Sequence, residues 1–209
     1  MVVDPPDIRV PQQDRSRRAV RRLLDAAESS FAEEGYERAS VRDIAERAGV
    51  AKGSVYQFFR NKQALLDAVV AKLGAEVDGV FAGLGSDPTE RRPVRSMVDQ
   101  VIGRTVELAG RRPAFRTLFA GLAATGPLAD AGAGLRERYR ERIAAVLATA
   151  DPPSVVGSLP VSTVCTEITR GLLAGAVDRS GRVDDELATE LSWAVASYLE
   201  SVRDRTERP

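Results

Sequence analysis

The segment that decides the fold comprises residues 35–66 and reads GYERASVRDIAERAGVAKGSVYQFFRNKQALL. Its apolar spacing predicts a short amphipathic helix over 41–48, with Ser40 and Asp43 placed as a capping box at the start. Gly49 follows directly and can adopt the left-handed backbone conformation that ends a helix in a tight turn. The segment therefore begins with a helix and a sharp corner.

A second short helix is predicted over 52–59, with Val55 and Phe59 four residues apart and facing the first helix. Two helices of this length joined by a turn containing glycine predict a helix-turn-helix. In that motif the second helix enters the major groove of DNA and its N-terminal side chains meet base edges. A hairpin of helices with a purely structural role would explain the apolar positions but not a polar outer face, so the pattern favours DNA binding. The hydrogen-bonding residues on that outer face are Lys52, Ser54, Tyr56 and Gln57.

Charge is unevenly distributed along the chain. The 209 residues carry 30 Lys and Arg against 30 Asp and Glu, so the formal net charge is zero. Residues 9–22 nevertheless hold six arginines and a single acid, Asp14. A local arginine cluster in a neutral chain is typical of a surface that faces nucleic acid, and a solvated helix face is the alternative.

Composition restricts the chemistry that is possible. The chain has no histidine, which excludes Ser-His-Asp triads and zinc sites that contain histidine. Its one cysteine, Cys165, leaves no intramolecular disulfide. The acidic run at 184–186 is interpreted as charge in the first turn of the last helix rather than as a metal-binding cluster. No apolar stretch approaches the ~18 residues that span a bilayer, and no secretory signal pattern is present. We expect a cytoplasmic protein that needs no cofactor, metal or membrane.

The segment resembles the DNA-binding domain of the tetracycline-repressor (TetR) family. The diagnostic pieces are IAERAGV at 44–50, KGSVYQFF at 52–59 and NKQALL at 61–66, in that order. The likeness covers about a quarter of the chain, and the remainder resembles the family only in being helical and of suitable length. One departure is Ala51, which stands where the family often has a serine that caps the second helix of the motif.

The resemblance implies a set of DNA contacts. Phosphate contacts are expected from the start of the first motif helix, from the tyrosine hydroxyl and from the lysine after the motif: Ser40, Arg42, Tyr56 and Lys62. The groove-entering end would be Lys52, Gly53 and Ser54, and Gln57 could read a base edge. Arg17 and Arg18 of the arginine cluster are expected to contact phosphates or the minor groove.

Helical periodicity continues along the chain and strand signals are nearly absent. Beyond the motif, helices are expected at 15–34, from 62 to 82, and at 89–109, 113–124, 128–149, 161–179 and 184–204. The predicted fold class is all-α. A flexible arm over 1–14 would precede a three-helix DNA-binding domain over 15–65, and a larger helical domain over 66–209 would, by resemblance, bind ligand and form the dimer.

Candidate residues in the larger domain rest on weaker patterns. The dimer interface is assigned to small and apolar residues of the last two helices, although a packed monomer core would explain them equally well: Gly171, Gly175, Leu187, Leu191 and Tyr198. Ligand-pocket candidates are chosen by helix position alone, and each could be ordinary core: Met97, Val101, Phe115, Phe119, Leu122 and Tyr139.

The sequence thus predicts a homodimeric, ligand-responsive transcriptional regulator. The expected mode is a repressor that a small, largely apolar effector releases from a palindromic operator in double-stranded DNA. The alternative is a helical small-molecule-binding protein or enzyme whose N-terminal unit is only structural.

Overall fold

The computed structural model describes residues 14–84, 92–121, 126–151, 159–178 and 180–206. Nine helices and two very short strands occupy these ranges: α1 (Asp14–Glu34), α2 (Val41–Arg47), α3 (Lys52–Phe58), α4 (Lys62–Val80), β1 (Arg92–Pro93), α5 (Val94–Arg111), α6 (Pro113–Phe119), α7 (Pro127–Leu147), β2 (Ala150–Asp151), α8 (Leu159–Ala176) and α9 (Asp185–Thr206). The predicted all-α class is confirmed. The expected arm over 1–14 lies outside the described residues except for Asp14, which begins α1.

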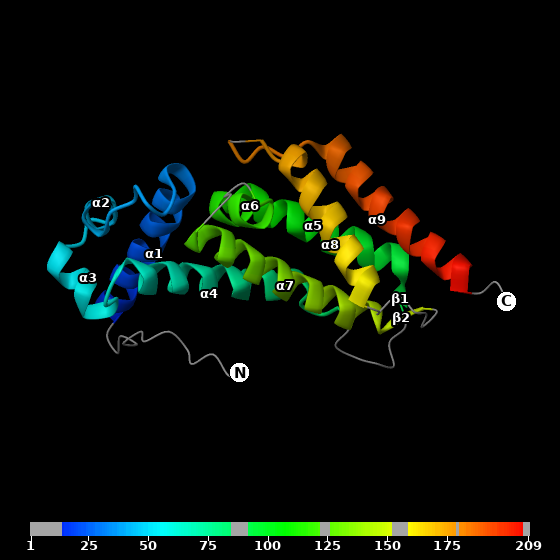
Figure 1. The fold of residues 1–209 in the computed structure, drawn as a ribbon, viewed down its shortest axis with the longest axis horizontal. Coiled ribbons are helices and arrows are strands. Elements are labelled where there is room, and N and C mark those ends of the chain that lie inside the picture. The colour runs from blue at the N-terminus through cyan, green and yellow to red at the C-terminus, as the bar shows by residue number, and fades with distance from the viewer. Residues whose placement is uncertain (1–13, 85–91, 122–125, 152–158, 179, 207–209) are drawn as a thin grey trace.

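The helices form a small N-terminal unit and a larger bundle (Figure 1). α2 and α3 lie at one end of the molecule, where α2 packs on α1 and α3 packs on α2, and α4 runs from this end into the bundle. There α4 packs beside α7, while α8 and α9 pack as a pair that also contacts α5 and α7. The long helix α4 therefore belongs to both parts and connects them.

The N-terminal unit is closed by the apolar residues that the sequence pattern indicated. Ile44, Val55 and Phe59 are almost completely buried, as are Leu23 and Phe31 of α1. The turn between α2 and α3 has Gly49 at φ +62°, where a side chain would be strained, and the amide of Val50 donates to the carbonyl of Ala45 at 2.9 Å. The tight corner thus brings the two short helices onto one shared core.

The end of α4 is fixed from the neighbouring helix. The guanidinium of Arg104 on α5 donates to the carbonyl oxygens of Val80, at 2.9 Å, and Ala82, at 2.8 Å. These carbonyls have no partner within α4, so Arg104 satisfies part of the helix end. Phe81 lies between them and is buried, which sets its ring against the interior of the bundle.

Two helix predictions differ appreciably from the structure. The helix expected at 89–109 begins only at Val94, preceded by Pro93 of β1. The helix expected at 113–124 ends at Phe119, because Gly121 has φ +71° and its amide bonds back to the carbonyl of Leu118 at 3.2 Å. β1 and β2 pair in parallel over two residues each, which is too short to leave a sequence signal.

Candidate nucleic-acid interface and buried cavity

The start of α2 is fixed by the predicted capping box, in a variant form. The amide of Asp43 donates to the Ser40 hydroxyl oxygen at 3.1 Å, and that hydroxyl donates in turn to the Asp43 carboxylate at 2.6 Å. The carboxylate therefore reaches the serine hydroxyl, not the backbone amide expected of a capping box. Arg42 is the second residue of this helix and is exposed.

The outer face of α3 is polar and open. Lys52, Gly53 and Gln57 are exposed, and half of the Tyr56 surface is exposed, whereas Ser54 is half-buried. A Cβ atom added to Gly53 would meet nothing within 4 Å, so the protein itself gives no packing reason for glycine at this position. Ala51 caps α3 without any side-chain hydrogen bond, as predicted, which leaves the first amides of the helix to solvent or a ligand.

The arginines of α1 lie directly beside α3. A surface hollow between the two helices is lined by Arg15 and Arg22 of α1 and by Ser54 and Gln57 of α3. A second hollow along α1 is lined by Asp14, Arg15, Arg18, Arg21 and Arg22. Arg18 is therefore part of this basic surface, while Arg17 is exposed but lines neither hollow. Sequence reasoning left out Arg15 and Arg22 from the site, because only the packing of α1 decides which side of the arginine cluster faces α3.

Lys62 has a role within the chain that the sequence did not predict. Its ammonium group donates to the carbonyl oxygens of Tyr36, Ala39 and Glu37 at 2.7, 3.2 and 3.4 Å. It also lies 4.3 Å from the centre of the Tyr36 ring. Lys62 thus ties the start of α4 to the segment between α1 and α2, and its expected phosphate contact stays a prediction.

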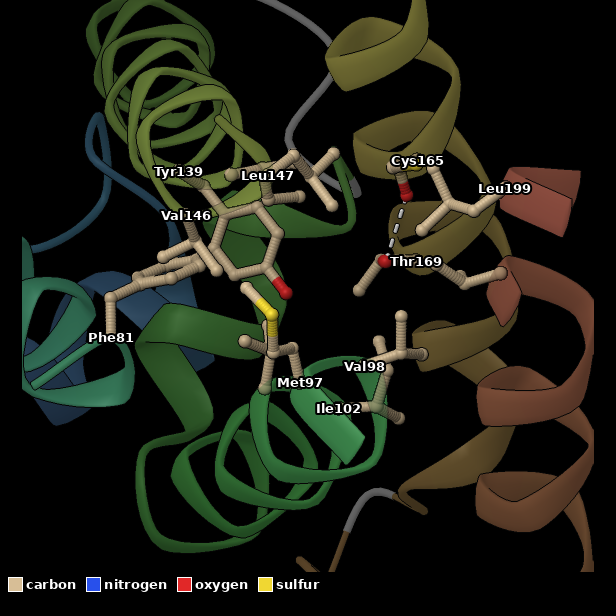
Figure 2. Close-up of a pocket in the computed structure, with 13 residues that line it drawn as sticks. Phe81, Met97, Val98, Ile102, Tyr139, Val146, Leu147, Cys165, Thr169 and Leu199 are labelled. Carbon is tan, nitrogen blue, oxygen red and sulfur yellow. Dashed lines mark hydrogen bonds between the residues drawn. The ribbon is translucent and has the colours of Figure 1, made fainter. Parts of the chain in front are cut away.

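The larger domain encloses a small cavity of about 30 Å³ (Figure 2). Three of the predicted pocket residues, Met97, Val101 and Tyr139, line it. The other lining residues come from α4's end and from α5, α7, α8 and α9, and among the described residues none of them is charged. This space holds about one or two water molecules, so a larger ligand would have to displace the lining side chains.

The predicted aromatic residues of α6 lie in the layer behind the cavity. Phe115 and Phe119 are fully buried and stacked on each other, with ring centres 5.0 Å apart, and neither lines the cavity, so their contact with a ligand stays a prediction. Phe119 instead packs edge-on against Tyr139 at 4.9 Å. Leu122 lies outside the described residues. α6 therefore contacts the cavity wall indirectly, through one aromatic pair.

Three polar groups border the cavity. The hydroxyl of Tyr139 lies 2.9 Å from that of Thr105, and the Thr169 hydroxyl donates to the carbonyl of Cys165 at 2.8 Å. Complete burial raises the pKa of Tyr139 well above its usual value, with the hydroxyls of Thr105 and Thr169 offsetting this only in part. Burial likewise raises the pKa of the Cys165 thiol to about 12. Both groups are therefore neutral at physiological pH.

The predicted dimer residues divide into two groups. Gly171 is exposed with nothing within 4 Å of an added Cβ, and Leu187 and Tyr198 are half-buried. Leu191, by contrast, is fully buried inside the single chain, so its assignment to a subunit interface is wrong. Gly175 is exposed, but a Cβ added there would lie 3.0 Å from Leu187 Cδ2 of the same chain. The predicted interface on α9 included a residue from the face that packs on α5 and α8, because the sequence does not show these contacts within the chain.

An ion-pair network joins the N-terminal unit to the bundle. Glu28 of α1 is buried, with its carboxylate 2.8 Å from Lys72 of α4 and 3.6 Å from the guanidinium of Arg112, between α5 and α6. Arg112 also donates to Glu76 of α4 at 2.8 Å. α6 additionally packs directly on α1. The two parts of the molecule thus share charged as well as apolar contacts.

The described residues contain no group of three or more His, Cys, Asp or Glu side chains placed to hold a metal ion. Asp184, in the acidic run, accepts the amide of Leu187 at 3.0 Å and so caps the start of α9. In the same part of the chain, no helix has the length and apolar character needed to cross a membrane.

Comparisons with known proteins agree with this architecture. A family model described as bacterial regulatory proteins, tetR family, matches residues 23–69, and one described as tetracyclin repressor-like, C-terminal domain, matches residues 93–199. The A-factor receptor protein of Streptomyces griseus is 36% identical over 88 residues, which are 42% of this chain and 29% of the receptor. The transcriptional repressor KstR2 of Rhodococcus jostii is 42% identical over 62 residues, 29% of this chain and 30% of the repressor. These matches span less than a third of each relative's length.

The whole fold is also found among solved structures. The regulator FadR of Bacillus subtilis, in complex with stearoyl-CoA, aligns with a TM-score of 0.56 and 19% identity, over 87% of this chain and 96% of that one. The second family model alone matches more than half of the chain. The chain belongs to the tetR family of bacterial regulatory proteins.

Proposed function

We propose that this protein is a transcriptional repressor that binds operator DNA as a homodimer and is released by a small, largely apolar effector. The observation that carries the proposal is the polar outer face of α3, which shares a surface hollow with the arginines of α1. The relative KstR2 is named a transcriptional repressor, which supports repression over activation. Acting on DNA in this way, the protein would work in the cytoplasm.

The proposed DNA contacts follow the layout of this surface. Gln57 and Lys52 would face base edges, and Gly53 would let the backbone of α3 approach the DNA closely. Phosphates would be bound by residues around the reading helix: Arg18, Arg42, Ser40, Ser54, Tyr56 and Lys62, joined by Arg15 and Arg22. Arg17 would contact a neighbouring phosphate or the minor groove from the exposed side of α1.

An electrophoretic mobility shift with the DNA upstream of the protein's own gene tests this function. We expect a sequence-specific shift that Gln57→Ala weakens for the operator but not for random DNA. Arg22→Ala should flatten the dependence of log Kobs on log salt by about one unit. Arg205→Ala, at the exposed end of α9 far from α3, is the charge-matched control and should leave the slope unchanged. Absence of any specific shift would favour the alternative of a helical binding protein or enzyme with a structural N-terminal unit.

The effector is proposed to bind the cavity of the larger domain. Its apolar lining supports a largely apolar ligand. FadR of Bacillus subtilis, which has a similar fold, was solved in complex with stearoyl-CoA. An effector that enlarges the cavity would displace Tyr139 and with it Phe119 of α6, which packs on α1. The effector must bind the released state more tightly than the DNA-bound state, by about 3 kcal/mol for a hundredfold response.

The homodimer is proposed to form through the outward faces of α8 and α9. Gly171 on α8 is open to close approach, and Leu187 and Tyr198 on α9 each leave part of an apolar side chain exposed. A single helix-turn-helix buries too little surface for tight operator binding, so two copies related by a two-fold axis would read two half-sites.

A further inference from the structure

The cavity presents its hydroxyl groups on opposite sides. Figure 2 shows the Tyr139 hydroxyl, from α7, beside Met97, and the Thr169 hydroxyl, from α8, across the same space and bonded to the carbonyl of Cys165. The remaining lining side chains are apolar apart from the Cys165 thiol. Recognition of any polar group on a bound molecule therefore depends on these two oxygens and one sulfur.

The hydroxyl groups of the two threonines, Thr105 and Thr169, already donate their hydrogen atoms to backbone carbonyls. Thr105 donates to the carbonyl of Val101 at 2.7 Å, and Thr169 donates to the carbonyl of Cys165 at 2.8 Å. Because the single hydrogen of Thr105 is used in this way, the 2.9 Å contact between Thr105 and Tyr139 makes Tyr139 the donor and Thr105 the acceptor. The hydroxyl oxygens of Tyr139 and Thr169 interact with each other, and each still has a lone pair available to accept a further hydrogen bond.

The cavity thus offers acceptors and hardly any donor. No lining side chain among the described residues carries an N–H group, and the backbone amides of the surrounding helices are used within those helices. The thiol of Cys165 is protonated, and an S–H group is only a weak donor. A carbonyl, ether or ester oxygen buried here would lose its hydrogen bonds to water without replacement, which is costly.

We propose that the effector is an uncharged amphiphile that buries a hydroxyl group, donating its hydrogen to the acceptor pair formed by Tyr139 and Thr169. The proposal rests on the proposed function only in taking this cavity as the effector site. A buried carboxylate or ammonium group is excluded because, in the part of the chain that the structure describes, no charged side chain lines the cavity to balance it. Ketones and ethers of the same shape fit the apolar walls but not the acceptor pair.

Isothermal titration of the purified protein with matched eight-carbon probes tests this preference. The probes are 1-octanol, 1-methoxyheptane, which has the same number of heavy atoms without the donor, and octanoate at pH 7.5. We expect octanol to bind about threefold to tenfold more tightly than the ether, as one net hydrogen bond gives, and octanoate not to bind. Met97→Ala is titrated in parallel, because loss of that side chain enlarges the small cavity.

Two variants attribute the preference to the acceptor pair. Tyr139→Phe keeps the ring that packs on Phe81 and Phe119 and removes only the oxygen, so it should reduce the octanol-to-ether ratio to about one. Thr169→Val should reduce it partly. Thr166→Val is the matched control, since Thr166 makes the same bond to the carbonyl four residues earlier on α8 but does not line the cavity.

Equal binding of octanol and the ether, tighter binding of octanoate, or no binding of octanol to either protein overturns the proposal. These titrations contain no DNA. A failed mobility shift with the octanol preference intact would therefore contradict the regulatory function alone, and a specific shift without the preference would contradict this inference alone.

Discussion

The side chain of Lys62 helps to fix the geometry of the N-terminal unit. Its bonds to the carbonyls of Tyr36, Glu37 and Ala39 hold the α1–α2 connection against the start of α4. We expect Lys62→Met to lower the free energy of unfolding by roughly 1–3 kcal/mol, because partly buried carbonyls lose a charged donor. Urea denaturation followed by circular dichroism measures this loss.

The same variant separates the two roles of Lys62. A residue that acts only as a phosphate contact would leave the unfolding curve unchanged and reduce the salt slope of operator binding by about one unit. If Lys62→Met is as stable as the natural protein, the structural role proposed here is wrong.

Asp78 provides a pH-dependent contact between α4 and α7. It accepts hydrogen bonds from Arg138 at 3.0 Å and from Arg142 at 2.8 Å, and the bond from Arg138 above all holds its pKa below the usual value. A carboxyl group with a lowered pKa in the folded state stabilises the protein above its unfolded pKa, near 3.9, and this contribution is lost as the pH falls through the folded pKa.

We therefore expect Asp78→Asn to lower stability at pH 7 by roughly 0.5–1 kcal/mol, since the pair is partly exposed, and to weaken the decline in stability below about pH 4. Thermal unfolding over pH 2–7 measures both effects. Glu137→Gln, which removes a more exposed pair within α7, is the control and should change stability less. An unaltered acid limb in Asp78→Asn would contradict the assignment.

At the scale of elements, α6 depends on its neighbours for stability. It has seven residues, too few to be stable alone. Arg136 of α7 donates to the carbonyl of Leu118 at 3.0 Å, and Arg170 of α8 donates to that of Ala120 at 3.2 Å. The C-terminal end of α6 is thus held by two arginines of the bundle, and α6 itself packs on α1. A structural change in the bundle would therefore be transmitted to the N-terminal unit through α6.

The close approach of α6 and α7 depends on Gly132. A Cβ added there would lie 2.4 Å from the carbonyl oxygen of Leu118, whereas one added at Gly134, two residues along the same helix, would meet nothing within 4 Å. We expect Gly132→Ala to destabilise the protein by roughly 1–3 kcal/mol through overpacking. Gly134→Ala should instead stabilise it by about 0.5–1 kcal/mol, because alanine is the better helix former. Paired denaturation curves measure the contrast, and equal effects of the two substitutions would show that α6 and α7 can separate without cost.

At the scale of the whole molecule, substitutions of Leu191 on α9 and Gly171 on α8 are expected to have opposite effects, because the first residue is buried within the chain and the second is exposed. Leu191 is fully buried within the chain, so Leu191→Asp should cost more than about 4 kcal/mol and abolish cooperative unfolding. Gly171→Gln places a long side chain on the exposed face of α8 and should leave the fold intact while shifting the dimer towards monomer. Operator affinity should fall with the dimer, although no DNA-contacting residue is changed.

Analytical ultracentrifugation at micromolar concentration, together with circular dichroism, measures both variants. Gly171→Ala is the control for helix propensity and should remain a dimer. A folded Leu191→Asp monomer would restore Leu191 to the interface, and a monomeric natural protein would remove the dimer from the proposed mechanism.

The sequence by itself determined the N-terminal unit, because its signals are local. Ser40 and Gly49 act through the backbone a few residues away, as a cap and a turn, and both are placed as their spacing predicted. The polar face of α3 follows from the same helical period, since Val55 and Phe59 fix which side is buried. Lys62 was named as a site residue, but its bonds to carbonyls 23–26 residues earlier have no sequence signal.

The tertiary structure alone decided the rest, because each outcome depends on which helix packs against which. Apolar periodicity gives one buried face per helix and does not say whether the partner is the same chain or a second copy, so Leu191 was misplaced. It does not distinguish residues that line a cavity from the layer behind them, so only the packing shows that Phe115 and Phe119 lie behind the cavity wall. Only the packing of α1 on the motif shows that Arg15 and Arg22 lie beside α3, and only the hydrogen bonds of Thr105 and Thr169 give the cavity its acceptor character.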